Sequence, residues 1–221
     1  MGRWNPEILE THIAPGISEF RDAVIPDLSG RFPQADFWVG NYFLNSVLRV
    51  GFRDRWRQIV NGFLRRASQG LSAYLDARRL TLEYLDGNSS LNPRIGRYYK
   101  TTAAWEGFAI DMTIAADLFK WLNNGAGAFT KNDGSKECRL YEIGNKVKHM
   151  PTCINSGQCT MNDTVPLWIN SAGLNSFGIT VTFDEAAKVL TDICTLADEL
   201  QDPLAFIEKA KAHQDCDEPA E

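Results

Sequence analysis

Hydrophobic residues recur at helical spacing along most of the chain. Over residues 54–86 they follow three-and-four spacing, which predicts one long helix with a continuous apolar face. Asp86-Gly87-Asn88 then has the chemistry of a turn, and Asn92-Pro93 offers an N-cap followed by proline at the first helical position. A second amphipathic helix runs from there to the residue before Asn123. Two long helices joined by a short loop predict an antiparallel hairpin.

Other helices are predicted on both sides of this hairpin. Apolar side chains surround most of the helix expected at 34–49, which is typical of a central helix buried on several sides. A loop at 123–136 precedes a short helix at about 136–148, which Pro151 bounds. Residues 152–164 are polar and are expected to be irregular.

The C-terminal third of the chain mixes strand and helix signals. The β-favouring runs 165–169 and 179–183 are separated by turn-forming residues, which predicts a small β-hairpin. Thr182 and Glu185 fit a capping box for a helix that ends at about Leu200. Asp202-Pro203 starts one more helix, expected to end at about His213.

These elements predict a mainly α fold, in which a helical bundle surrounds the long hairpin and the β-hairpin at about 165–183 is a small appendage. Four prolines divide residues 1–33 into short pieces, so we expect an entry segment there. Residues 34–214 form a single α-helical domain, followed by an acidic tail at 215–221. A chain of 221 residues is long enough to bury one substantial core.

The charge of the chain is unevenly distributed. The formal net charge of −5 excludes a generally basic nucleic-acid-binding protein. Residues 49–100 nevertheless hold eleven basic and four acidic residues, a net of +7, and residues 183–221 hold three basic and eleven acidic, a net of −8. The basic ridge could follow a phosphate backbone. Alternatively, its arginines are solvated or pair with the acidic C-terminal helices.

The N-terminal residues lack the unbroken apolar stretch of a secretory signal, and no run approaches the roughly 18 apolar residues that span a bilayer. We therefore expect a cytoplasmic protein that has no membrane partner. Five cysteines is an odd number in a chain that buries its own core, so free thiols are expected.

Candidate chemistry is concentrated on the helix at 136–148. Cys138, Glu142, Asn145 and His149 follow one another at steps of four, three and four, so they share one stripe of a helix. A carboxylate, an amide and an imidazole on one stripe can support recognition or acid/base chemistry. The same stripe can equally be a solvated face, on which Glu142 pairs with Lys146.

The order of elements resembles the HEPN group of helical domains, found in bacterial toxin and phage-defence systems. In that group, a helical hairpin is followed by a short helix with an Arg, a polar residue and a His. Asn145-Lys-Val-Lys-His149 is similar to the polar-residue-to-His half of this motif. The nearest upstream arginine is Arg139, nine intervening residues away, and position 144 is glycine.

The resemblance implies metal-independent RNA cleavage across a homodimer interface, without a cofactor. It makes His149, Asn145 and Glu142 the candidate catalytic residues. The candidate substrate-binding residues are Arg139, Lys146 and Lys148, of which either lysine can supply a cation.

Two other hypotheses remain open. Cys138, His149, Cys153 and Cys159 are possible zinc ligands, although the five residues between the last two exceed the usual spacing. The protein can also be a non-catalytic helical interaction module that acts as a homodimer or as a subunit of a complex. The sequence contains no Gly-rich phosphate loop, nucleophile elbow or HExxH motif, which removes several large enzyme classes.

Overall fold

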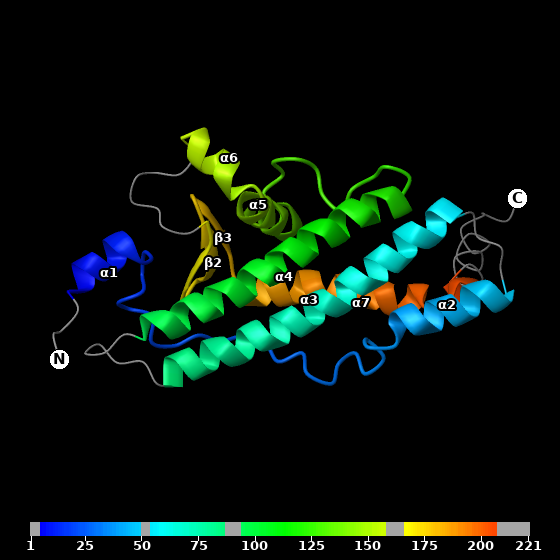
Figure 1. Cartoon of the computed structure of the whole chain (residues 1–221), viewed down its shortest axis with the longest axis horizontal. Helices are drawn as coiled ribbons and strands as arrows, with labels where there is room; N and C mark the ends of the chain where they lie inside the picture. Colours follow the sequence, from blue (N-terminus) through cyan, green and yellow to red (C-terminus); the bar gives the residue numbers. More distant parts are fainter. Residues whose placement is uncertain (1–4, 50–53, 87–93, 158–165, 207–221) are drawn as a thin grey trace, which may run out of the picture.

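The computed structural model describes residues 5–49, 54–86, 94–157 and 166–206. Its largest feature is the pair of helices α3 (Asp54–Asp86) and α4 (Ile95–Leu122), which lie side by side (Figure 1). The predicted hairpin is therefore confirmed. The first of the two helices has the predicted bounds. The second begins at Ile95, after Arg94 as N-cap, whereas the predicted cap at 92–93 lies outside the described residues.

Aromatic side chains fill the interface between α3 and α4. Tyr84 packs on Tyr98 with ring centroids 5.5 Å apart, and Tyr74 packs on Trp105 and Phe108 at 5.5 and 5.6 Å. Edge-on contacts of this kind stabilise a core beyond simple burial of area. The polar atoms of these rings are satisfied, because Trp105 Nε1 donates to Thr81 Oγ1 at 3.0 Å and Tyr98 donates its hydroxyl to the Ile169 carbonyl at 2.9 Å.

The helix α2 (Trp38–Arg49) lies at one end of the bundle (Figure 1). It buries Trp38 and Tyr42, and Trp38 Nε1 donates to Asp198 Oδ1 at 2.9 Å. Phe37 and Phe43, in contrast, are each 60% exposed. The prediction of a central helix buried on several sides was wrong, because among the described elements only α3 and α7 (Phe183–Leu200) pack extensively against it.

A three-stranded antiparallel sheet takes the place of the predicted two-stranded hairpin. Its strands are β1 (Trp168–Asn170), β2 (Gly173–Ser176) and β3 (Ile179–Val181), in that order. The small β element at 165–183 is thus confirmed, with a middle strand added where turn residues were expected. Two-residue turns on both sides of β2 allow this, and Phe177 and Gly178 adopt positive φ in the second turn. The sheet belongs to the core, since Ile169, Leu174 and Val181 are fully buried.

The entry segment and α7 complete the core. In the entry segment, α1 (Pro6–His12) is a single short helix capped by Asn5, and Ile17, Phe20 and Leu28 from the same segment are buried in the core. The predicted capping box at the start of α7 is confirmed, since Thr182 Oγ1 and the Glu185 carboxylate each accept from the other's backbone N–H.

Residues 203–206 begin the predicted last helix, and its remainder and the acidic tail lie outside the described residues. The stretch 152–164, predicted to be irregular, begins instead with helix: α6 spans Met150–Asn155, with Pro151 in its first turn. Proline is favoured at that position because its missing N–H would have no helical partner there. Residues 158–164 lie outside the described part of the chain.

The helix α5 (Lys136–Lys148) has the predicted bounds and lies against α4 at a glycine. A Cβ atom added to Gly144 would lie 2.0 Å from Thr113 Oγ1 and 2.4 Å from the Ala109 carbonyl oxygen. Both distances are far below van der Waals contact, and the Ala109 carbonyl oxygen cannot move away without distorting the backbone of α4. The absence of a side chain at Gly144 therefore sets how closely the two helices approach.

We predict that Gly144→Ala lowers the free energy of unfolding by about 1–3 kcal/mol, because the new methyl group overpacks the α4–α5 contact. Urea unfolding followed by circular dichroism measures this change. Gly107→Ala is the matched control on α4, since an added Cβ there meets nothing within 4 Å. Alanine should stabilise that position by about 0.5–1 kcal/mol. Equal effects of the two substitutions would contradict the account of Gly144.

Candidate functional site

The predicted polar stripe runs along α5 from a buried to an exposed end. Cys138 is buried, and its Sγ lies 3.6 Å from Glu142 Oε1. Asn145 is half-buried, and His149 is exposed. His149 lies just beyond the last helical residue as the C-cap, where its backbone N–H donates to the Asn145 carbonyl at 2.9 Å. Three of the four residues therefore lie within α5, and His149, directly after the helix, is the exposed one.

Tyr141, which the sequence analysis did not single out, connects this row to α4. Its hydroxyl donates to Asp117 Oδ1 at 2.9 Å. A hydrogen bond from the Asn145 side chain lowers the pKa of Tyr141, but burial and the nearby Asp117 carboxylate raise it more, so the phenol stays protonated. In the sequence, the spacing of four residues between Tyr141 and Asn145 indicates that the two side chains are neighbours on one helix.

Arg139 does not reach the exposed end of the stripe. Its guanidinium lies 2.5 Å from Glu185 Oε1 and 2.5 Å from the Thr180 carbonyl oxygen, so it joins α5 to β3 and to the start of α7. Burial would raise the pKa of Glu185, but hydrogen bonds from Thr182 and Arg139, together with the Arg139 charge, lower it below its usual value. The Glu185 carboxylate therefore stays ionised and keeps Arg139 in an ion pair within the same chain.

The two candidate lysines have different surroundings. Lys146 Nζ lies 3.5 Å from the Phe177 carbonyl oxygen and 5.5 Å from the centre of the Phe177 ring. None of the ion pairs among the described residues joins Lys146 to Glu142. The Glu142–Lys146 pair expected on a solvated face therefore does not form. Lys148 is exposed and has no ion-pair partner within the described residues.

Three arginines of the basic ridge pair with acids, but not with the acids of the C-terminal helices that one sequence alternative named. Arg66 binds Asp111 on α4 at 2.7 Å, and Arg78 lies 3.3 Å from Asp27 in the entry segment. Arg79 pairs along α3 itself. The predicted partners on the acidic C-terminal helices were wrong for these three residues, because acids of α3 itself, of α4 and of the entry segment lie closer.

The acidic side chains of α7 instead neutralise the first turns of α5. Glu185 pairs with Arg139, and Asp192 Oδ2 lies 4.0 Å from Lys136 Nζ, which also contacts Glu137. Of the α5 cations, this leaves Lys146 and Lys148 at the C-terminal end without a carboxylate partner among the described residues.

The possible metal ligands are not gathered in the described structure. Cys138, Cys153 and Cys194 are buried free thiols, and burial raises the pKa of Cys194 to about 12. Within the described residues, no three His, Cys, Asp or Glu side chains are placed to hold a metal ion. Cys159, the fourth predicted zinc ligand, lies outside them.

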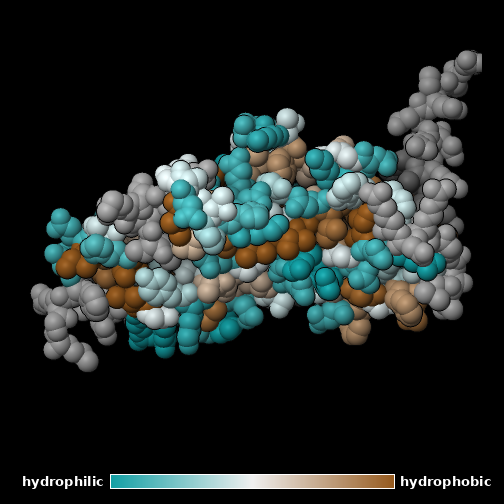
Figure 2. Space-filling model, turned by 45° about the horizontal axis from the view of Figure 1, so that its top comes forward, coloured by the Kyte–Doolittle hydropathy of each residue, from teal (hydrophilic) through white to brown (hydrophobic). Residues whose placement is uncertain are grey.

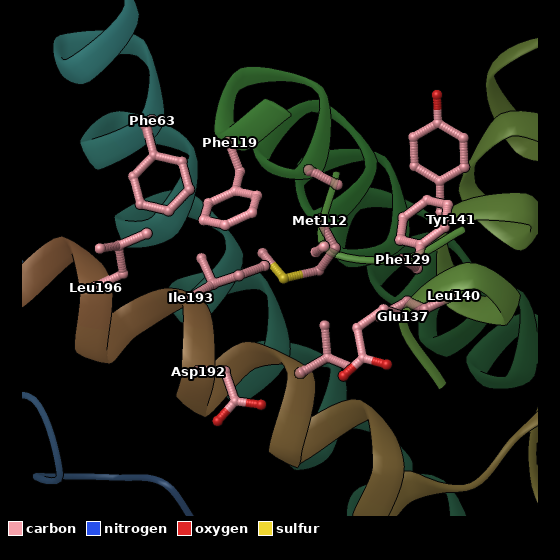
Figure 3. A pocket seen from close by; sticks show the side chains of 13 residues that line it. Phe63, Met112, Phe119, Phe129, Glu137, Leu140, Tyr141, Asp192, Ile193 and Leu196 are labelled. Carbon is pink, nitrogen blue, oxygen red and sulfur yellow. The ribbon is translucent and has the colours of Figure 1, made fainter. Parts of the chain in front are cut away.

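A cavity of about 310 Å³ lies between α3, α4, α5, α7 and the loop before α5 (Figure 3). Hydrophobic and aromatic side chains form most of its wall, and among the described residues that line it the only charged groups are two carboxylates on one side. No pattern in the sequence indicates this cavity, because its lining residues come from five segments: Phe63, Met112, Ala116, Phe119, Ala128, Phe129, Glu137, Leu140, Tyr141, Val189, Asp192, Ile193 and Leu196.

Glu106 on α4 is a second residue that the sequence analysis missed. It is half-buried and has no hydrogen-bond or ion-pair partner among the described residues, and burial raises its pKa. It lies about one helical turn before Ala109, which contacts Gly144. In the sequence, Glu106 is distinguished only as the single acidic residue of the run Thr102-Ala-Ala-Trp-Glu-Gly-Phe108.

None of the described helices is long and apolar enough to cross a membrane. Comparisons of the chain with models of protein families, with curated proteins and with solved structures gave no match.

We predict that Arg139→Ala lowers the free energy of unfolding by about 2 kcal/mol at pH 7, because the Glu185 carboxylate loses a charged donor. The folded-state pKa of Glu185 is lowered, so its stabilising contribution exists above the unfolded pKa of about 4.3 and is lost as the pH falls through the folded value. The difference between wild type and variant should therefore shrink below about pH 4.

Urea titrations of both proteins from pH 3 to pH 7 measure this difference. Arg79→Ala is the control, because Arg79 forms exposed pairs on α3, which contribute less than about 1 kcal/mol. A difference between wild type and Arg139→Ala that is constant over this pH range would contradict the assignment.

Proposed function

We propose that this protein is of the HEPN-like bacterial defence or toxin type, and that it binds RNA as a homodimer through the C-terminal turn of α5. The observation that carries the proposal is the exposed group Lys148 and His149, next to half-buried Asn145. These residues lie within five positions of Gly144, whose backbone packs on α4. A rigid, exposed cluster of cationic and hydrogen-bonding side chains suits a phosphate backbone.

The local charge supports this choice of surface. The α7 acids pair with Lys136 and Arg139 near the start of α5, whereas Lys148 at its end has no acidic partner in the described chain. The dipole of a helix favours cations at its C-terminus, so it helps to hold Lys148 there but does not itself attract an anion. The attraction of a phosphate group to the C-terminal turn of α5 therefore comes from the unpaired side-chain charge.

Cleavage on this surface needs two protomers. His149 of one protomer accepts the proton of the ribose 2′-hydroxyl as its oxygen attacks phosphorus. His149 of the second protomer donates a proton to the departing 5′-oxygen, which leaves a 2′,3′-cyclic phosphate. Asn145 orients a phosphate oxygen, and Lys148 stabilises the developing negative charge, since Arg139 is held by Glu185. Glu142, two turns before His149, remains a predicted member of the site.

An outward apolar strip on α4 supports the homodimer. Figure 2 shows hydrophobic residues that follow the course of α4 across one face of the molecule. On α4, Ile110 and Ile114 are half-buried, and Trp121, seven residues after Ile114 and so on the same side of the helix, is 56% exposed. Apolar side chains on the outer side of a helix mark a surface that a partner can cover. The strip lies beside the row of α4 residues that contacts α5, so pairing two copies along it would bring their α5 turns near each other.

A non-catalytic interaction module is the second candidate, and one observation favours it. Arg139 is the only arginine of α5, and it is bound to Glu185 and Thr180 rather than exposed beside His149. A site that keeps Asn145 and His149 without an arginine can retain RNA or protein binding without cleavage.

We predict that the protein is a dimer with twice its chain mass of 24.8 kDa, and that Ile114→Glu makes it monomeric by placing a charge in the α4 strip. Size-exclusion chromatography with light scattering measures the mass. Val24→Glu is the control, because Val24 is 92% exposed and lies on the entry segment. A dimer that persists in Ile114→Glu would remove this strip from the interface.

We predict that the protein binds a fluorescein-labelled mixed-sequence single-stranded RNA, and that Lys148→Glu weakens binding about tenfold and reduces the salt dependence by about one phosphate contact. Fluorescence anisotropy at several salt concentrations measures both effects. Lys131→Glu, with the same charge change in the exposed loop before α5, should leave the affinity within about twofold.

The same RNA distinguishes the two candidate functions. In the presence of EDTA, the wild type should cut it to fragments with cyclic phosphate ends, and His149→Ala should bind RNA without cutting it. Binding without cleavage by the wild type would support the interaction module instead. Absence of RNA binding at low salt would contradict the RNA proposal altogether.

A further inference from the structure

The cavity described above combines an apolar interior with a negative rim. Phe63, Met112 and Phe119 form its inner wall, and the ring of Phe129 packs on that of Tyr141 at 5.1 Å on another side (Figure 3). A volume of about 310 Å³ falls at the lower end of the range for small-molecule sites, about 300–1,000 Å³. The site therefore suits a small molecule with one aromatic ring.

The charged groups at the cavity select the sign of its ligand. Glu137 on α5 and Asp192 on α7 both line it, and their carboxylates lie on the same side in Figure 3. One cation, Lys136, contacts Glu137 and lies 4.0 Å from Asp192, so the three groups together carry a net charge of −1. An anionic ligand would meet two carboxylates there, whereas a cationic ligand would be attracted.

We propose that this cavity binds a small aromatic amine, with its ring among Phe119, Phe129 and Met112. Its ammonium group lies beside the Asp192 carboxylate, since the Lys136 ammonium group already contacts Glu137. The ring exchanges water for apolar and aromatic surface, which favours binding. The ammonium group of the ligand remains at the rim of the cavity, where the Asp192 side chain is 71% exposed. At the rim, water can still hydrate the ammonium group. The cavity is separate from the proposed RNA surface, which is formed by the opposite end of α5.

Three probes of nearly equal shape test the proposal: 3-phenylpropan-1-amine, 3-phenylpropan-1-ol and 3-phenylpropanoate. Isothermal titration calorimetry with the full chain measures each affinity at pH 7. The amine should bind at least about tenfold more tightly than the carboxylate, with the alcohol between them. An equal or higher affinity for the carboxylate, or no detectable binding of the amine, would overturn the proposal.

Substitutions then locate the site. Asp192→Asn should weaken amine binding about threefold and leave alcohol binding unchanged, because only the charge interaction is lost. Asp184→Asn, an exposed acid on the same helix outside the cavity lining, is the matched control and should change neither affinity. Ala116→Phe should abolish binding of all three probes by filling the cavity.

Thermal unfolding of each variant verifies that it is folded. If Ala116→Phe does not fold, the comparison of Asp192→Asn with Asp184→Asn still decides, since both positions are exposed. Amine affinity that is the same in Asp192→Asn as in the wild type would place the ligand elsewhere and overturn the assignment.

Discussion

The contact between α5 and α4 at Gly144 is the constraint on which both candidate sites depend. The two helices approach so closely there that a single methyl group would overlap the Ala109 carbonyl and the Thr113 hydroxyl. Because α5 is held at this point, its next turns present Asn145 and His149 on the surface. Its preceding turn places Leu140 and Tyr141 in the wall of the cavity. One backbone contact therefore positions a polar surface at one end of the helix and an apolar cavity at the other.

Charge pairing divides α5 in the same way. Glu185 and Asp192 of α7 pair with Arg139 and Lys136 in the first turns of the helix, and Lys148 at its end has no such partner in the described residues. The net charge of −5 is an average over this arrangement. This average conceals ion pairs between α7 and α5 and ion pairs that arginines of α3 form with nearby acids. It also conceals a small cationic surface at the end of α5.

The sequence was sufficient where the determinants are local. The bounds of α3 and α5 and the capping box of α7 follow from hydrophobic spacing, turn residues and a Thr–Glu pair three residues apart. It was insufficient where neighbours distant in the chain decide. The exposure of Phe43 on α2 depends on how few elements pack around that helix, and β2 forms in a stretch of turn residues because β1 and β3 pair with it on both sides.

The candidate site likewise has features that follow from local sequence and features that depend on residues distant in the chain. The row from Cys138 to His149 follows from helical spacing alone. In the structure Cys138, Glu142 and Asn145 lie within α5, and His149 caps its C-terminal end. The pairing of Arg139 with Glu185 joins residues 46 positions apart, and the cavity takes its wall from five segments. Neither leaves a pattern in the order of residues, because each arises from the packing of complete helices.

Hydrogen–deuterium exchange of the backbone amides tests most directly whether the contact at Gly144 holds α5 in place. In the wild type, amides 140–147 should exchange as slowly as those of α4 around Ala109, and far more slowly than the loop at 123–135. In Gly144→Ala, protection should fall in α5 while the interior of the α3–α4 hairpin keeps its protection. Exchange in wild-type α5 as fast as in that loop would contradict the account, as would a loss of protection spread evenly over all helices of the variant.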